Sequence, residues 1–156
     1  MKSTIQRIAA ATLMALLAIP GSAALCSKSQ HEAITDAHQK AGIAAEHLYE
    51  DVDHLTAIDK AAIRPQVDGI ARALQQVREA EQTCTHAGLP RNKVAAWNYQ
   101  QMIDHEQAAY LDLEELQKEL AIKAPRLNHV ISLIVDIRRQ MDMAEEAHRD
   151  CKACLI

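Results

Sequence analysis

The segment Pro125–His148, PRLNHVISLIVDIRRQMDMAEEAH, carries the clearest secondary-structure pattern in this chain. Its apolar residues recur every three or four positions, which is the repeat of an amphipathic α-helix rather than of a strand. They are Leu127, Val130, Ile134, Ile137, Met141 and Ala144. Proline is tolerated in the first turn of a helix, so Pro125 marks its start. The segment predicts a long helix with one buried face.

Three further segments toward the N-terminus follow the same repeat, and proline or glycine residues separate them. The first helix is expected over about residues 29–55. The second contains Ile63 to Val77 and ends near residue 86, with its start left open, and the third carries Tyr99 to Leu120 after a restart at Pro90. Asp59 could cap the second helix, but Pro65 fits best in a first turn, so a kink or a short separate turn is expected at Pro65. Four such helices with short loops predict an all-α, up-down-up-down four-helix bundle. Only four aromatic residues and eight Gly or Pro argue against a β-sandwich or barrel.

The N-terminal 23 residues have the layout of a secretory signal peptide. Lys2 and Arg7 precede an apolar run, residues 8–19, and Pro20-Gly21 then leads to small residues suited to cleavage. This run is shorter than the roughly 20 apolar residues that span a bilayer. We therefore expect cleavage after Ala23, a single domain over residues 24–156, a periplasmic or secreted location and no stable membrane insertion.

All four cysteines lie after the predicted cleavage site. An even number of cysteines in an oxidising compartment indicates disulfides. In the expected topology Cys26, Cys84, Cys151 and Cys154 all fall at one end of the bundle, and the heptad positions of Cys84 and Cys151 face the core. We expect the pairs Cys84–Cys151 and Cys26–Cys154, with Cys26–Cys151 and Cys84–Cys154 as the alternative. A bond within Cys151-Lys-Ala-Cys154, or a metal thiolate site, is a further alternative.

Eight histidines are many for a chain of 156 residues, and some fall on the core faces. His148 continues a heptad position of the last helix, and His31 lies nearly level with it. Together with His86, these two could bind Zn²⁺ or Cu²⁺, because imidazole suits both ions. The alternative is that these histidines only cap the end of the core through hydrogen bonds.

A second candidate group lies deeper in the predicted bundle. Glu106 occupies a core position, where a carboxylate needs a partner, and His38 is expected at a similar depth. Met102 and Met141 also come to this depth, and thioether sulfur is a soft ligand that suits copper. The possible metal ligands are thus His31, His38, Met102, Glu106, Met141 and His148. The alternative is that the methionines fill gaps in the core.

The C-terminal segment Cys151-Lys-Ala-Cys154 resembles the haem-attachment segment of cytochrome c′, a family of exported four-helix bundles. That family has a histidine directly after the second cysteine, whereas this chain has Leu155. The resemblance therefore does not extend to the axial ligand. Non-covalent haem, as in bundles similar to cytochrome b562, could use His148 with His31 or His38, although the alanine-rich helix faces favour tight packing over a haem cleft.

Known enzyme and nucleic-acid-binding patterns are not completed in this sequence. A zincin motif that starts at His105-Glu106 would need a second histidine at position 109, which is alanine. The formal net charge of −4 argues against nucleic-acid binding. We therefore expect no enzymatic activity. The first hypothesis is a module that binds another exported protein, as an inhibitor, immunity protein or adaptor; the alternative is a periplasmic protein that binds copper, zinc or haem.

Overall fold

The described residues, 26–84 and 93–151 of a computed structural model, form four α-helices and no strand. The helices are α1 (Lys28–Val52), α2 (Lys60–Gln82), α3 (Lys93–Ala121) and α4 (Leu127–Asp150). This confirms the all-α class and the number of helices predicted from the sequence. α1 ends at Val52, a few residues before the expected end, and α2 begins after the Asp59 cap that the sequence offered and ends at Gln82, before the expected end near residue 86.

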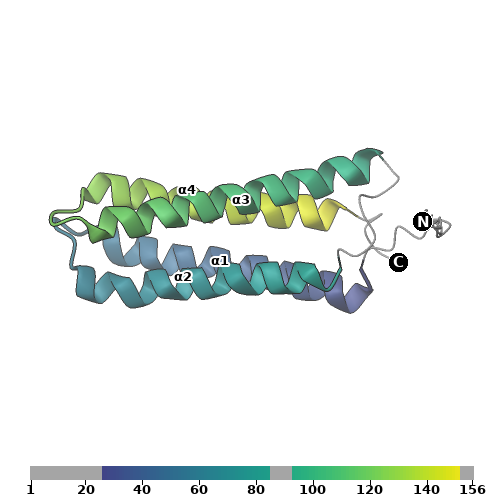
Figure 1. Ribbon diagram of the computed structural model, residues 1–156, viewed down its shortest axis with the longest axis horizontal. Helices are drawn as coiled ribbons and strands as arrows, with labels where there is room; N and C mark the ends of the chain where they lie inside the picture. The colour runs from purple at the N-terminus through teal and green to yellow at the C-terminus, as the bar shows by residue number, and fades with distance from the viewer. Residues whose placement is uncertain (1–25, 85–92, 152–156) are drawn as a thin grey trace, which may run out of the picture.

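The four helices run along one common axis (Figure 1). α1 packs against both α2 and α4, and α3 packs mainly against α4, while α2 and α3 contact each other much less. The two short loops, residues 53–59 and 122–126, lie together at one end of the bundle. The start of α1, the end of α2, the start of α3 and the end of α4 lie at the other end, which we call the cysteine end.

Side-chain caps explain where α1 and α2 begin. The Ser27 hydroxyl accepts from the Gln30 amide at 3.3 Å while the Gln30 side chain accepts from the Ser27 amide at 2.8 Å, which is a capping box. Asp59 caps α2 by accepting from the amides of Ala61 and Ala62. The expected break at Pro65 was wrong, because α2 runs continuously through it. Pro65 is on the exposed face, where the one carbonyl that loses its amide partner remains close to solvent.

One main apolar core runs between the helices, and the predicted helix faces supply it. Its fully buried side chains include Leu48, Ile70, Leu74, Leu116, Ile134 and Ile137. A small separate cluster of Cys26, Ile34 and Cys84 closes the cysteine end between α1 and α2. A third small cluster joins Ala95 of α3 to Cys151 at the end of α4.

The predicted cysteine pairings were wrong. Cys26 is bonded to Cys84, with their Cα atoms 4.8 Å apart, which excludes both pairings expected from the sequence. Cys84 and Cys151 do both face the interior, as predicted, but α2 packs beside α1 and not beside α4. Cys26, just before α1, is therefore the cysteine within reach of the end of α2. No described cysteine is free, and Cys154 lies outside the described residues.

The sequence also predicts a signal peptide, no stable membrane insertion and an exported location. The predicted signal peptide, residues 1–23, lies outside the described residues. Across residues 26–84 and 93–151, no helix has the length and apolar character needed to cross a membrane. The Cys26–Cys84 disulfide is compatible with the oxidising compartment expected for an exported protein.

Replacing Gly69 with alanine should raise the free energy of unfolding by about 0.5–1 kcal/mol, because glycine in a helix interior costs backbone entropy. Gly69 lies within α2, and an added Cβ would lie 3.8 Å from the terminal nitrogen of the flexible Arg72 side chain. Urea unfolding of both proteins measures the difference. A loss of stability would mean that α2 is not regular at this position.

Candidate functional site

Polar side chains from all four helices meet inside the bundle near the cysteine end. His31 and His38 lie two turns apart on α1, and His148 lies in the last turn of α4. Glu106 comes from α3 and Glu81 from α2. Four of these five side chains are buried, which is unusual for charged and polar residues unless they are paired. We refer to the three histidines as the imidazole cluster and to Glu81 and Glu106 as the carboxyl pair.

His38 and Glu106 form the closest contact of this group. The His38 Nε2 atom lies 2.5 Å from the Glu106 Oε1 atom, and the two residues are only 1% and 5% exposed. A carboxylate accepts, so the proton of a neutral His38 lies on Nε2. The Nδ1 atom then carries the free electron pair of the ring. It is buried and has no hydrogen-bond partner among the residues that the structure describes.

The imidazole ring of His148 lies against the rings of both His31 and His38. The ring centres of His31 and His148 are 3.9 Å apart, and those of His38 and His148 are 5.8 Å apart. The Thr35 hydroxyl donates its one proton to the backbone carbonyl of His31 at 3.1 Å. It therefore accepts from His148 Nδ1, which is 3.3 Å away, and His148 Nε2 is left with the free electron pair.

His31 adds a third nitrogen to this cluster. Its Nδ1 atom is buried and makes no hydrogen bond within the described part of the chain, although the residue as a whole is only half-buried. A buried polar atom without a partner costs free energy, so each such atom calls for an explanation. Two unpartnered ring nitrogens, each on a ring that contacts His148, point to a missing hydrogen-bond partner, a water molecule or a cation.

Burial keeps the three imidazoles neutral at pH 7. It lowers the pKa of His38 to about 4 and that of His148 to about 3, and it also lowers the pKa of His31. The neighbouring histidines lower the pKa of His148 further. Neutral imidazole is the form that binds metal ions. Because these folded-state pKa values lie below 6.5, the two buried histidines cost stability as the pH falls from about 6.5 toward 4 and 3.

Glu81 is a member of the site that the sequence reasoning missed. Its carboxyl group is hydrogen-bonded to that of Glu106, and burial raises the pKa of Glu81 to about 9 and that of Glu106 to about 7. The shared proton therefore lies on Glu81, which donates to Glu106. The sequence held a signal for this, because position 81 follows Leu74 and Val77 at helical spacing. Burial near both carboxyl groups also raises the pKa of Tyr99 to about 12.

Glu81→Gln should make stability less sensitive to alkaline pH. The pKa of Glu81 is about 9 in the folded chain against 4.5 for an ordinary glutamate, so the folded state holds an extra proton between these values. Its contribution to stability is complete below pH 4.5 and falls as the pH rises toward 9. Glutamine does not titrate, so between pH 7 and 9 the variant should lose on the order of 2 kcal/mol less than the parent.

Urea unfolding at pH 7, 8 and 9 measures this difference, with the exposed Glu79→Gln on the same helix as the control. Parallel pH profiles for the parent and Glu81→Gln would show that Glu81 is already ionised at neutral pH.

The predicted methionine ligands belong to the main apolar core. Met102 and Met141 are both buried in the main apolar core. The Cβ atom of Met141 faces Gly42, one turn beyond His38 on α1. Burial in the core fits both roles considered for these methionines, metal ligand and gap-filler, so both stay predictions. His86, considered as a third ligand beside His31 and His148, lies outside the described residues.

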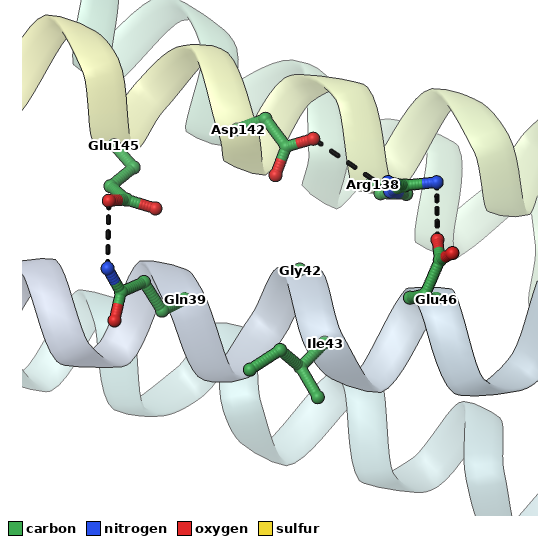
Figure 2. A pocket seen from close by; sticks show the side chains of 7 residues that line it. All are labelled: Gln39, Gly42, Ile43, Glu46, Arg138, Asp142 and Glu145. Carbon is green, nitrogen blue, oxygen red and sulfur yellow. Dashed lines mark hydrogen bonds and ion pairs between the residues drawn. The ribbon is translucent and has the colours of Figure 1, made fainter.

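A shallow groove lies between α1 and α4 (Figure 2). It has a volume of about 260 Å³, and charged side chains line it. Arg138 pairs with Glu46 across the groove and lies 3.9 Å from Asp142, while Gln39 donates to Glu145 at 2.9 Å. These groups satisfy one another, so the groove is a polar seam that joins the two helices.

Neither any known protein family nor any curated protein or solved structure matches this chain. The function therefore has to be inferred from the side chains themselves. Within residues 26–84 and 93–151, no three His, Cys, Asp or Glu side chains stand ready to hold a metal ion. Imidazoles that share one tetrahedral ion, with metal–nitrogen bonds of about 2.0 Å, have ring centres about 5 Å apart. The distances of 3.9 and 5.8 Å lie on either side of this value, and His31 and His38 are two turns apart on α1, so the rings would have to move to share one ion.

Proposed function

We propose that this chain is an exported metal-binding protein that holds one copper or zinc ion in the imidazole cluster. His31, His38 and His148 are the ligands, and Glu106 orients His38 by accepting its Nε2 proton. The observation that carries the proposal is the pair of buried Nδ1 atoms, on His31 and His38, that lack a hydrogen-bond partner among the described residues.

The donor chemistry of the cluster supports copper or zinc over other ions. Neutral imidazole suits both, whereas calcium and magnesium prefer oxygen ligands. A histidine that binds a metal commonly donates its other ring proton to a carboxylate, which fixes its tautomer. The 2.5 Å contact between His38 and Glu106 has this form.

Charge balance supports a cation at the same place. The pKa of Glu81 is about 9 and that of Glu106 is about 7, so at pH 7 Glu81 is protonated while Glu106 carries a negative charge in about half of the molecules, and in most of them above pH 7. A buried charge without a counter-charge is costly. A divalent cation on the Nδ1 side of His38 would compensate the charge on Glu106. Binding would require the tilted rings of His31 and His148 to separate, toward the spacing of about 5 Å between rings that share an ion, and to turn their nitrogen atoms toward it.

The other function predicted from the sequence, binding to another exported protein, stays a prediction. On α1, the acidic residue Glu46 is paired with Arg138 of α4. Within residues 26–84 and 93–151, no surface feature identifies a protein partner.

Calorimetric titration of the oxidised, metal-free chain with zinc and copper tests the proposal. We expect one ion per chain and the same affinity in a control variant with both exposed histidines replaced, His47→Ala/His54→Ala. The absence of stoichiometric binding, or its loss in the control, would show that the imidazole cluster is not a metal site.

A further inference from the structure

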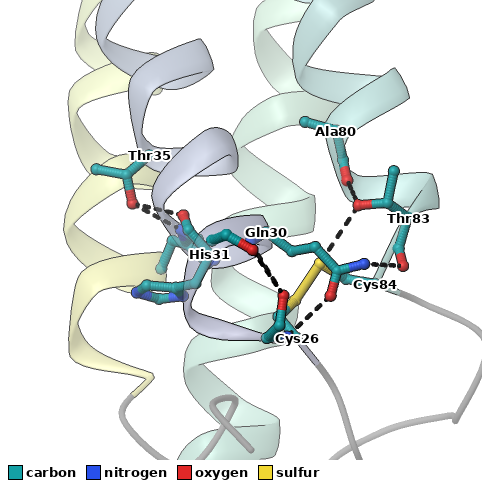
Figure 3. The surroundings of a disulfide bond; sticks show 10 residues. Cys26, Gln30, His31, Thr35, Ala80, Thr83 and Cys84 are labelled. Carbon is teal, nitrogen blue, oxygen red and sulfur yellow. Dashed lines mark hydrogen bonds between the residues drawn. A yellow bond between two sulfur atoms is a disulfide. The ribbon is translucent and has the colours of Figure 1, made fainter.

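We infer that the Cys26–Cys84 disulfide controls metal binding by holding His31 in the imidazole cluster. Reduction of this bond would release the first turn of α1 and weaken the site. The inference rests on the proposed function and adds a redox control to it. Figure 3 shows the disulfide beside the first turn of α1, which carries Gln30 and His31.

The covalent bond links the start of α1 to the end of α2. Cys26 precedes the N-cap of α1, and Cys84 follows the C-cap of α2. The two cysteines are 58 residues apart in sequence and belong to a small apolar cluster, separate from the main core, with Ile34. Within the described part of the chain, the neighbouring polar link is the exposed bond from Gln30 Nε2 to the Thr83 carbonyl, at 2.9 Å.

His31 is the cluster member that depends on this first turn. Its backbone amide donates to the carbonyl of the N-cap Ser27 at 3.0 Å, one residue after Cys26. His38 and His148, in contrast, are 1% and 2% exposed and lie deeper in the bundle. If the disulfide opens, the terminal turns of a helix are the part that frays first. The site would then keep two imidazoles and lose the third.

The redox step is an ordinary thiol–disulfide exchange with a dithiol reductant of the thioredoxin-like class. One thiolate of the reductant attacks a sulfur of the disulfide, and the other cysteine leaves as a thiolate. The second thiol of the reductant then attacks the reductant's own sulfur in the mixed disulfide, and the second cysteine of the chain leaves as a thiolate. Two electrons pass to Cys26 and Cys84, which end as two thiols after taking up two protons, and the reductant ends as a disulfide.

The double variant Cys26→Ser/Cys84→Ser mimics the reduced state without adding thiolates that could themselves bind metal. We expect zinc to bind at least 10-fold more weakly to this variant than to the oxidised parent, with helix content unchanged by circular dichroism. Ser29→Ala, in the same exposed turn, serves as the matched control and should bind like the parent. Equal affinity of the double variant and the parent would overturn the inference while leaving the metal site in place.

Hydrogen exchange provides a second test that needs no metal. Exchange is compared between the oxidised parent protein and the same protein reduced with a phosphine. We expect faster exchange over residues 30–35 after reduction and little change over residues 130–145. Unchanged exchange in the first turn of α1 would also overturn the inference. If the oxidised, unsubstituted protein bound no zinc, that result would instead contradict the proposed function itself.

Discussion

His148→Ala should lower the affinity for zinc or copper by at least about 100-fold while the bundle stays folded. Replacing a residue that merely supports a metal ligand commonly costs 10–100-fold, and losing a ligand should cost no less. His148 lies between the other two imidazoles, with its ring centre 3.9 Å from that of His31 and 5.8 Å from that of His38. Its removal therefore breaks up the whole cluster.

The matched control is His129→Ala, near the other end of the same helix, where His129 contacts the exposed Glu115 at 3.0 Å. This control should bind metal like the parent. Calorimetric titration gives the affinities, and thermal unfolding of the metal-free proteins checks that both variants fold. Similar affinities for His148→Ala and His129→Ala would place the metal elsewhere.

Glu106→Ala should have the largest effect on stability, a loss of about 3 kcal/mol in the free energy of unfolding. Glu106 accepts from His38 at 2.5 Å and from the protonated Glu81. Alanine would remove the acceptor of the His38 Nε2 proton and of the Glu81 proton, and a buried donor that loses its acceptor costs about 1–3 kcal/mol. Urea unfolding at pH 7 measures the loss.

Two further variants separate the charge of Glu106 from its hydrogen bonds. Glu106→Gln keeps an acceptor for His38 and should cost about 1 kcal/mol in stability. It should still lower metal affinity 10–100-fold, since a neutral amide supports the ligand less well than a carboxylate. The exposed Glu114→Ala on the same helix should change stability by less than about 0.5 kcal/mol. If Glu106→Ala were as stable as Glu114→Ala, the carboxyl pair would not be a buried network.

The helical repeat of the sequence was enough to predict which residues face the interior. Ile134, Ile137, Glu106 and His148 all lie on faces that the spacing assigned to the core, and all four are buried. Counting residues from the cysteine end also placed His38 near Glu106 and His31 near His148, and the structure brings each pair together. Depth along a bundle follows from helix rise, which is nearly constant.

The lateral arrangement of the helices was not predictable in the same way. The repeat shows that Cys84 and Cys151 face inward, but not that α2 lies beside α1 and away from α4. For this reason the pairing Cys26–Cys84 was missed. Pro65 was misjudged because the cap at Asp59 starts α2 before the proline. Glu81 was missed because a glutamate at the end of an apolar series is ordinarily exposed to solvent.

Nitrogen NMR of the imidazole rings tests the central claim most directly. The eight histidines give separate ring signals, and His31→Ala, His38→Ala and His148→Ala assign the three of interest. On addition of one equivalent of zinc or cuprous copper, we predict large shifts of Nδ1 of His31, Nδ1 of His38 and Nε2 of His148, while the exposed His47 and His54 stay unchanged. Shifts confined to exposed histidines, or no shifts at all, would contradict a metal site in the imidazole cluster.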